Sequence, residues 1–183
     1  MSAGPVLRSY CYIDGAYLRA EGKNASVLFP NPRMMTLWVV DAIQSIGGRV
    51  LLRRTSYYDA DPSGPTPSPE LEQYWQFVED QFDTDLRFGE VRGKPKRQKG
   101  VDVLLAVDML SASFRQLFDV AVLIAGDADF VPLIHEVRRL GTTVVVAGVK
   151  NTTANELRIS ADRFVPIDFD SCPAWSQEPF VPR

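Results

Sequence analysis

Four aspartates stand where predicted strands end or a predicted helix begins. Asp14 follows the first apolar run of the chain, Asp127 and Asp129 follow the run VAVLIAG, and Asp102 opens the helical pattern VDVLLAVDML. In a parallel sheet the carboxyl ends of the strands meet at one edge, so we expect these carboxylates to converge there. Carboxylates held that close repel one another unless a cation neutralises them, and oxygen ligands suit Mg²⁺ or Mn²⁺. Such a metal activates water and stabilises charge on a phosphodiester.

Each aspartate also has an ordinary structural explanation. Asp127 and Asp129 can cap the helix that follows, and an acid in the first helical turn, such as Asp102, interacts favourably with the macrodipole. Asp108 lies six residues further along that helix, roughly 120° round its axis, and faces either the site or a basic partner. Their joint placement at one edge favours a metal site. We predict Asp14, Asp102 and Asp127 as ligands, Asp129 as a further ligand or water-positioning group, and Asp108 behind them.

A basic stretch, RGKPKRQKG, directly precedes Asp102. Its cations would offset the acids and grip a phosphate backbone, although charge runs also occur in solvated loops. Arg19, in a predicted loop after Asp14, adds a further phosphate contact. The basic side chains that we predict to bind nucleic acid are Lys94, Lys96, Arg97, Lys99 and Arg19.

Apolar runs of strand type alternate along the chain with helical periodicity, which predicts repeated βα units. Predicted strands cover 6–13, 49–60, 86–91, 120–125, 143–148 and 164–167, and predicted helices cover 34–46, 70–82, 101–113, 130–140 and 153–161. This order is typical of an α/β fold with a mostly parallel sheet covered on both faces. We expect one domain over residues 1–168, followed by an irregular, proline-containing C-terminal tail over 169–183.

Composition argues against several functional classes. The net charge of −3 gives no overall attraction to nucleic acid, so binding requires a local patch. No apolar run approaches the roughly 20 residues that span a bilayer, so we expect no membrane association. The single histidine, His135, disfavours His-based zinc sites and Ser-His-Asp catalysis. Cys11 and Cys172 lie far apart, which indicates free thiols and a cytoplasmic location.

Four motifs occur in order between Tyr10 and Asp168: YIDGAYL, KGVDVLLAVDML, VLIAGDADFVPLIHEVRRLGTTVVVAG and ELRISADRFVPID. Together they resemble the NYN domain family, the LabA-like members of the PIN-like nuclease superfamily. The resemblance implies a Rossmann-like, PIN-type three-layer fold and a ribonuclease that cuts single-stranded RNA with Mg²⁺ or Mn²⁺. It assigns the acids of the family to Asp14, Asp102, Asp127, Asp129 and Asp108.

One motif departs from the family, which has DGxN after the first strand where this chain has Asp14-Gly15-Ala16-Tyr17. Tyr17 can form a hydrogen bond or stack on a base, but it coordinates a metal less well than Asn. This favours an alternative, a non-catalytic PIN-like module that binds RNA or protein. A Rossmann-like phosphatase is disfavoured, because its DxD motif would need an acid in place of Ala16. We expect the protein to bind RNA, and to form a homodimer or bind a protein partner.

Overall fold

The computed structural model describes residues 5–60, 67–92 and 97–170 of the 183-residue chain, with the backbone alone for 45–47, 60, 90–92 and 97–99. Seven strands form one sheet in the order β4-β3-β2-β1-β5-β6-β7. All neighbouring pairs are parallel except β3 and β4, which are antiparallel. The predicted Rossmann-like α/β fold with a mostly parallel sheet is confirmed. Most of the predicted tail, 171–183, lies outside the described residues.

The strands are β1 (Val6–Asp14), β2 (Arg49–Ala60), β3 (Thr84–Arg92), β4 (Arg97–Lys99), β5 (Val120–Ile124), β6 (Thr143–Val149) and β7 (Arg163–Ile167). The helices are α1 (Gly15–Asn24), α2 (Pro32–Gly47), α3 (Pro69–Glu79), α4 (Val101–Phe114), α5 (Val131–Arg139) and α6 (Asn155–Ser160), with one 3₁₀ turn, η1 (Ala128–Phe130), before α5. No helix in the described part of the chain has the length and apolar character needed to cross a bilayer.

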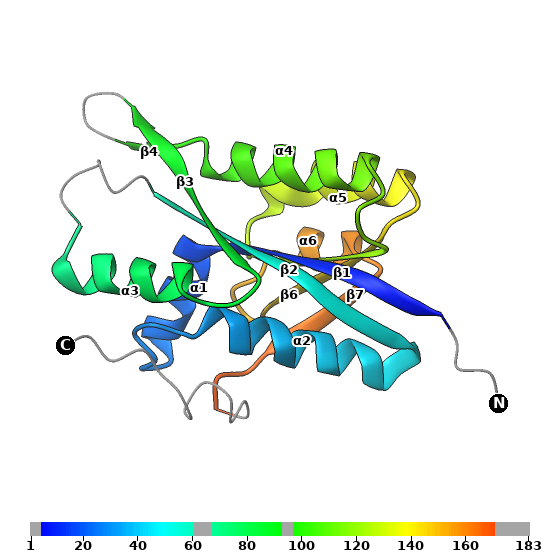
Figure 1. Cartoon of the computed structure of the whole chain (residues 1–183), viewed down its shortest axis with the longest axis horizontal. Coiled ribbons are helices and arrows are strands. Elements are labelled where there is room, and N and C mark those ends of the chain that lie inside the picture. Colours follow the sequence, from blue (N-terminus) through cyan, green and yellow to red (C-terminus); the bar gives the residue numbers. More distant parts are fainter. Residues whose placement is uncertain (1–4, 61–66, 93–96, 171–183) are drawn as a thin grey trace.

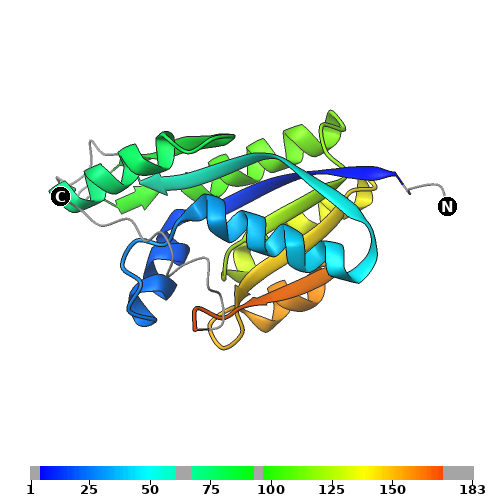
Figure 2. The same ribbon diagram turned by 60° about the horizontal axis from the view of Figure 1, so that its bottom comes forward.

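Helices cover both faces of the sheet, so the molecule has three layers (Figures 1 and 2). One buried apolar cluster joins α1, α2 and α3 to the sheet, and a second cluster joins α4, α5 and α6 to its other face. Alternate residues of β1 divide between them, since Cys11 and Ile13 belong to the first cluster and Tyr12 to the second. Every residue of the central strand β5 is buried, which explains its uninterrupted apolar sequence.

Two predicted loops contain regular structure. The segment after Asp14, which carries Arg19, is the helix α1; its buried residues are Gly15, Leu18, Glu21 and Gly22, so it shows little apolar periodicity. Part of the basic stretch is the strand β4, whose three residues pair with 90–92 and have no apolar alternation to reveal them.

The strand order creates a crevice at the carboxyl edge of the sheet between β1 and β5. These two strands are neighbours, with Ile13 opposite Ile124, yet β1 continues into helices on one face and β5 into helices on the other. Chain segments therefore diverge from this point, which is where open α/β sheets bind ligands. Asp14 lies on the β1 side of the crevice, and Asp127 follows the end of β5.

Candidate functional site at the carboxyl edge of the sheet

Asp14 and Asp127 are fixed at the ends of their strands by capping hydrogen bonds. The Asp14 carboxylate accepts from the Tyr17 backbone N–H at 3.1 Å and caps α1. The Asp127 carboxylate accepts from the Asp129 N–H at 2.9 Å and caps η1. Asp129 itself lies within this turn and is exposed. Asp14 and Asp127 therefore act as helix caps, and the capping bonds hold these two predicted metal ligands at the crevice.

Asp102 is brought to the same region by the start of α4. Gly100 adopts the left-handed conformation (φ +85°) that turns the chain into the helix. Gly89 lies so close to Val101 that a Cβ there would approach its Cγ2 to 2.4 Å. The end of β3 and the start of α4 are thus packed together, and Asp102 is presented on the exposed first turn.

The carboxylates at this edge influence one another electrostatically. Burial raises the pKa of Asp14, and with smaller contributions from the charges of Asp102 and Asp59 the pKa reaches about 6. The pKa of Asp102 is also raised, first by partial desolvation and then by the charges of Asp127 and Asp129. The charge of Asp102 therefore acts on Asp14, and the charges of Asp127 and Asp129 act on Asp102, so the accumulation of negative charge at this edge is unfavourable.

The donor set suits a hydrated divalent cation rather than a closed cage. Among the described residues, no three Asp, Glu, His or Cys side chains are arranged as a ready-made metal-binding group. Mg²⁺ keeps several water ligands and often takes only one or two carboxylates from a protein. Asp14, Asp102 and Asp127 offer hard oxygen donors whose mutual repulsion a cation would relieve.

Asp108 faces a basic partner, which is one of the two orientations expected from the sequence. Its carboxylate accepts a hydrogen bond from the Tyr58 hydroxyl at 3.0 Å and pairs with Arg87 at 3.2 Å. The predicted contribution of Asp108 to catalysis stays a prediction. In this geometry Asp108 would act on the site indirectly, by positioning Tyr58 and Arg87.

Tyr17 anchors α1 to the ends of β5 and β6. Its hydroxyl accepts from the Val149 N–H at 2.8 Å and shares a hydrogen bond with Thr153 at 3.0 Å. The ring lies against Gly126, where an added Cβ would be 2.4 Å from Tyr17 Cε2. A Cβ on Gly148 would likewise be 2.8 Å from the hydroxyl. The Tyr17 hydroxyl is therefore engaged in hydrogen bonds within the fold, and the Tyr17 ring is packed against Gly126.

Asp59 is a buried acid at this edge that the sequence analysis missed. It is fully buried near the end of β2, pairs with Arg19, and accepts from Trp75 Nε1 at 2.7 Å. Arg19, predicted as a phosphate contact, also donates to the Tyr57 hydroxyl at 3.3 Å. Asp59 is the last but one residue of β2, as Asp14 is the last residue of β1, so examining the end of every predicted strand for acids would have found it.

The basic stretch is only partly described. Lys94 and Lys96 lie outside the described residues, and Arg97 and Lys99 belong to β4, of which the backbone alone is described. Their predicted role in nucleic-acid binding stays a prediction.

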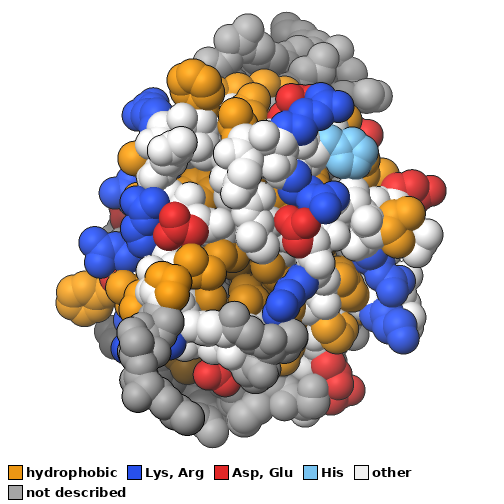
Figure 3. Space-filling model, turned by 90° about the vertical axis from the view of Figure 1, so that its right-hand side faces the viewer, with side chains coloured by type: hydrophobic (Ala, Val, Ile, Leu, Met, Phe, Trp, Pro, Cys, Tyr) orange, Lys and Arg blue, Asp and Glu red, His pale blue; other side chains and the backbone are white. Residues whose placement is uncertain are grey.

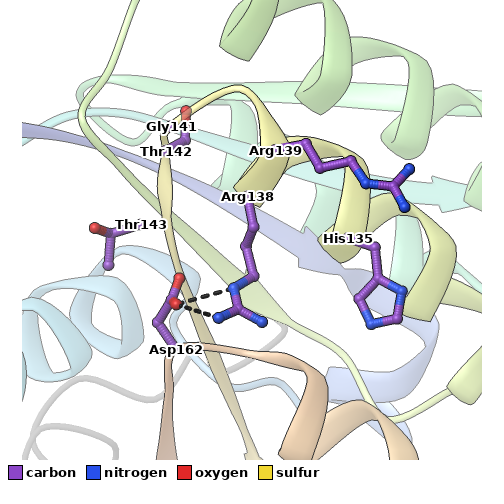
Figure 4. Close-up of a pocket in the computed structure, with 7 residues that line it drawn as sticks. All are labelled: His135, Arg138, Arg139, Gly141, Thr142, Thr143 and Asp162. Atoms are coloured by element: carbon purple, nitrogen blue, oxygen red, sulfur yellow. Dashed lines mark hydrogen bonds and ion pairs between the residues drawn. The ribbon is translucent and has the colours of Figure 1, made fainter.

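A hollow of about 490 Å³ is lined by the C-terminal part of α5, the turn that follows it and the start of β6 (Figure 4). The Arg138 guanidinium is bonded to other residues of the fold. It pairs with Asp162 at 2.8 Å and donates to the Ser160 carbonyl at 2.8 Å. His135 is exposed on α5, on a face where acidic and basic side chains are mixed (Figure 3). This hollow is thus braced by a structural ion pair.

Comparisons with known proteins place the fold in context. The model of the NYN domain family matches residues 8–168. No curated protein matches the chain. The crystal structure of a protein of unknown function from Vibrio parahaemolyticus is similar, with a TM-score of 0.69 and 20% identity over 93% of this chain and 98% of that chain. At this identity the likeness shows the fold alone.

Proposed function

Since the chain belongs to the NYN domain family, whose members are typically ribonucleases, we propose that it hydrolyses phosphodiester bonds of single-stranded RNA with the help of Mg²⁺ or Mn²⁺. The observation that carries this proposal is the placement of Asp14 at the end of β1 and of Asp127 after the neighbouring strand β5, with Asp102 near enough for its charge to raise the pKa of Asp14. These carboxylates border the crevice between β1 and β5, where a fold of this kind takes its ligand.

The side chains at the crevice have distinct roles in the proposed reaction. Asp14, Asp102 and Asp127 hold the cation, which when bound supplies an activated water and a positive charge beside the phosphate. The capping bonds of Asp14 and Asp127 keep both carboxylates at fixed strand ends. Asp129, exposed next to this set, accepts a hydrogen bond from the attacking water and orients it toward phosphorus.

A second candidate function is RNA or protein binding without cleavage. The observation that favours it is the anchored position of Tyr17, where the family has Asn. Its hydroxyl is engaged with Val149 and Thr153, so it is not a free polar group facing the crevice. The two functions differ in turnover, and an activity measurement separates them.

The decisive experiment compares wild type with Asp127→Asn on end-labelled single-stranded RNA in the presence of Mn²⁺. We expect wild type to cleave the RNA and the variant to lose activity by about 10²-fold, because one charge that holds the cation is gone. Asp80→Asn, an exposed acid at the end of α3, is the matched control and should cleave like wild type. Equal cleavage by Asp127→Asn and wild type at matched RNA and metal would remove the nuclease proposal; binding without cleavage by wild type would favour the second function.

A further inference from the structure

A groove of about 400 Å³ lies between α4 and the strands β1, β2 and β3. Its lining combines three arginines with three tyrosines: Arg54, Arg87, Arg115, Tyr10, Tyr12 and Tyr58. Guanidinium groups bind phosphate, and tyrosines offer both an aromatic face and a hydroxyl. This combination is typical of surfaces that bind single-stranded nucleic acid.

The strand register connects the groove to the crevice. Asp14 lies opposite Tyr58 in the β1–β2 pairing, and Tyr58 lies opposite Arg87 in the β2–β3 pairing. Arg54 shares a face of β2 with Tyr58, since alternate residues of a strand point the same way. The groove therefore begins beside Asp14 and leads along the sheet toward the amino ends of the strands.

Arg54 and Arg115 keep donors for a ligand, and Arg87 is paired with Asp108 at 3.2 Å. Arg54 pairs with Asp85 at 3.3 Å, with its guanidinium carbon 5.9 Å from the centre of the Tyr10 ring. Arg115 is exposed, and its guanidinium forms no hydrogen bond or ion pair with another residue that the structure describes, while its backbone N–H donates to the Ser111 carbonyl at the end of α4. A guanidinium has five N–H donors, so one carboxylate orients Arg54 without exhausting it. Exposed pairs of this kind are weak in water and yield readily to a phosphate.

The Tyr12 hydroxyl is a polar group without a protein partner in the described structure. Tyr12 is only 2% exposed and lines the groove, yet no hydrogen bond joins its hydroxyl to another described residue. The neighbouring Tyr58 hydroxyl, in contrast, donates to Asp108 at 3.0 Å. Among the described residues, the only buried side-chain nitrogen or oxygen without a partner is Arg158 Nε, so the Tyr12 hydroxyl reaches the solvent of the groove and is open to a ligand that supplies a donor or acceptor there.

We propose that this groove binds a single-stranded RNA segment next to the scissile bond, with its phosphates on Arg54, Arg87 and Arg115 and a ribose or base hydrogen-bonded to Tyr12. The proposal rests on the proposed function, because the segment is continuous with the RNA in the crevice. The groove has the volume of a site for one small ligand, which suits one nucleotide with the phosphates on either side of it rather than a duplex.

The first test measures RNA affinity without cleavage. The cleavage-impaired Asp127→Asn protein is titrated in EDTA against a short labelled single-stranded RNA by fluorescence anisotropy. Adding Arg54→Glu and Arg115→Glu should raise Kd about tenfold or more and lower the slope of log Kd against log salt by roughly 0.7 for each lost phosphate contact. Arg139→Glu is the control, since Arg139 is an exposed arginine on α5 that pairs locally with Glu136 and does not line the groove. If the groove variant and this control both bind like the parent, the groove does not hold RNA.

The second test isolates Tyr12. Tyr12→Phe removes one hydroxyl and keeps the ring in its apolar surroundings. We expect RNA binding to weaken severalfold while the melting temperature stays at the parent value or above it, because no bond within the described structure is lost. Unchanged affinity for RNA would overturn the assignment of the Tyr12 hydroxyl.

A cleavage measurement separates failure of the groove from failure of the proposed function. With Asp127 restored, the Arg54→Glu and Arg115→Glu variant is assayed with Mn²⁺ on RNA and on bis(p-nitrophenyl) phosphate, a diester too small to reach from the crevice along the groove. We expect an increased KM for RNA and an unchanged rate on the small diester. An unchanged KM for RNA counts against the groove. Absence of hydrolysis by wild type on both substrates refutes the nuclease proposal, and the anisotropy result then decides the groove by itself.

Discussion

Asp14 caps a helix and faces other carboxylates at the same time. Its carboxylate accepts from the Tyr17 N–H, and burial together with Asp102 and Asp59 raises its pKa to about 6. A carboxylate has two oxygens and about four lone-pair positions, so a capping bond leaves room for a cation. Capping and metal binding, which look like alternatives when each aspartate is taken alone, are compatible in one side chain.

The raised pKa of Asp14 predicts how stability depends on pH in the metal-free protein. Because the folded pKa lies above the ordinary value of 3.8, the folded state binds a proton that the unfolded chain releases, and stability falls as pH rises from about 4 to about 6. Asp14→Asn keeps a good capping side chain and removes the charge. At pH 7 in EDTA we expect the variant to be more stable than wild type by ~1–2 kcal/mol, after allowance for partial solvent screening.

Urea denaturation of both proteins in EDTA at pH 4 and pH 7 measures this difference. The two proteins should be close in stability at pH 4 and diverge as pH rises. A wild type that gains stability relative to Asp14→Asn between these pH values would show that the buried carboxylate is stabilised, not strained, by its surroundings.

At the scale of elements, Tyr17 joins three parts of the fold that are far apart in the sequence. The hydroxyl of this α1 residue bonds to Thr153, 136 residues away, and to the backbone at the end of β6, while its ring occupies the space left by Gly126 after β5. The position where the family has Asn thus carries a larger side chain, and two neighbouring glycines, Gly126 and Gly148, make room for it.

This packing predicts strong coupling between Gly126 and Tyr17. Gly126→Ala should lower the free energy of unfolding by ~1–3 kcal/mol, because the new Cβ would approach the Tyr17 ring to 2.4 Å. In a Tyr17→Asn background the same change should cost clearly less, since the three nearest atoms to that Cβ all belong to Tyr17. Urea denaturation of the four proteins gives the coupling energy. Strictly additive losses would mean that another group opposes the Cβ.

The same elements show what sequence patterns can and cannot predict. The strand β2 begins and ends where its apolar and β-branched run predicts, and the family resemblance is confirmed over residues 8–168. The helix α1 escaped prediction because its buried side consists of Gly15, Glu21 and Gly22 beside a single leucine. The bond between Tyr17 and Thr153 could not be foreseen at all, since it depends on which distant loops the folded sheet brings together.

At the scale of the whole molecule, the sheet separates two apolar clusters, and its central strands contribute to both. Cys11 on β1 is 1% exposed within the cluster beneath α1, α2 and α3. Burial raises the pKa of its thiol to about 12, so almost no thiolate exists in the folded state at neutral pH. A reagent can reach this thiol only when the central sheet opens, which makes Cys11 a reporter of global unfolding.

We therefore predict that the Cys11 thiol of a Cys172→Ser protein reacts with a disulfide reagent far more slowly in the folded state than in the urea-unfolded chain. The expected ratio of the two rates is on the order of 10³ or more, which corresponds to a free energy of unfolding of ~5 kcal/mol. Mn²⁺ should slow the reaction further, because a ligand of the folded state alone lowers the unfolded population. That added protection should disappear in Asp127→Asn, although Cys11 lies within β1 and Asp127 lies beyond the end of β5. Fast labelling under native conditions would show that the sheet opens locally at β1, and equal Mn²⁺ protection in both proteins would place the cation away from the crevice.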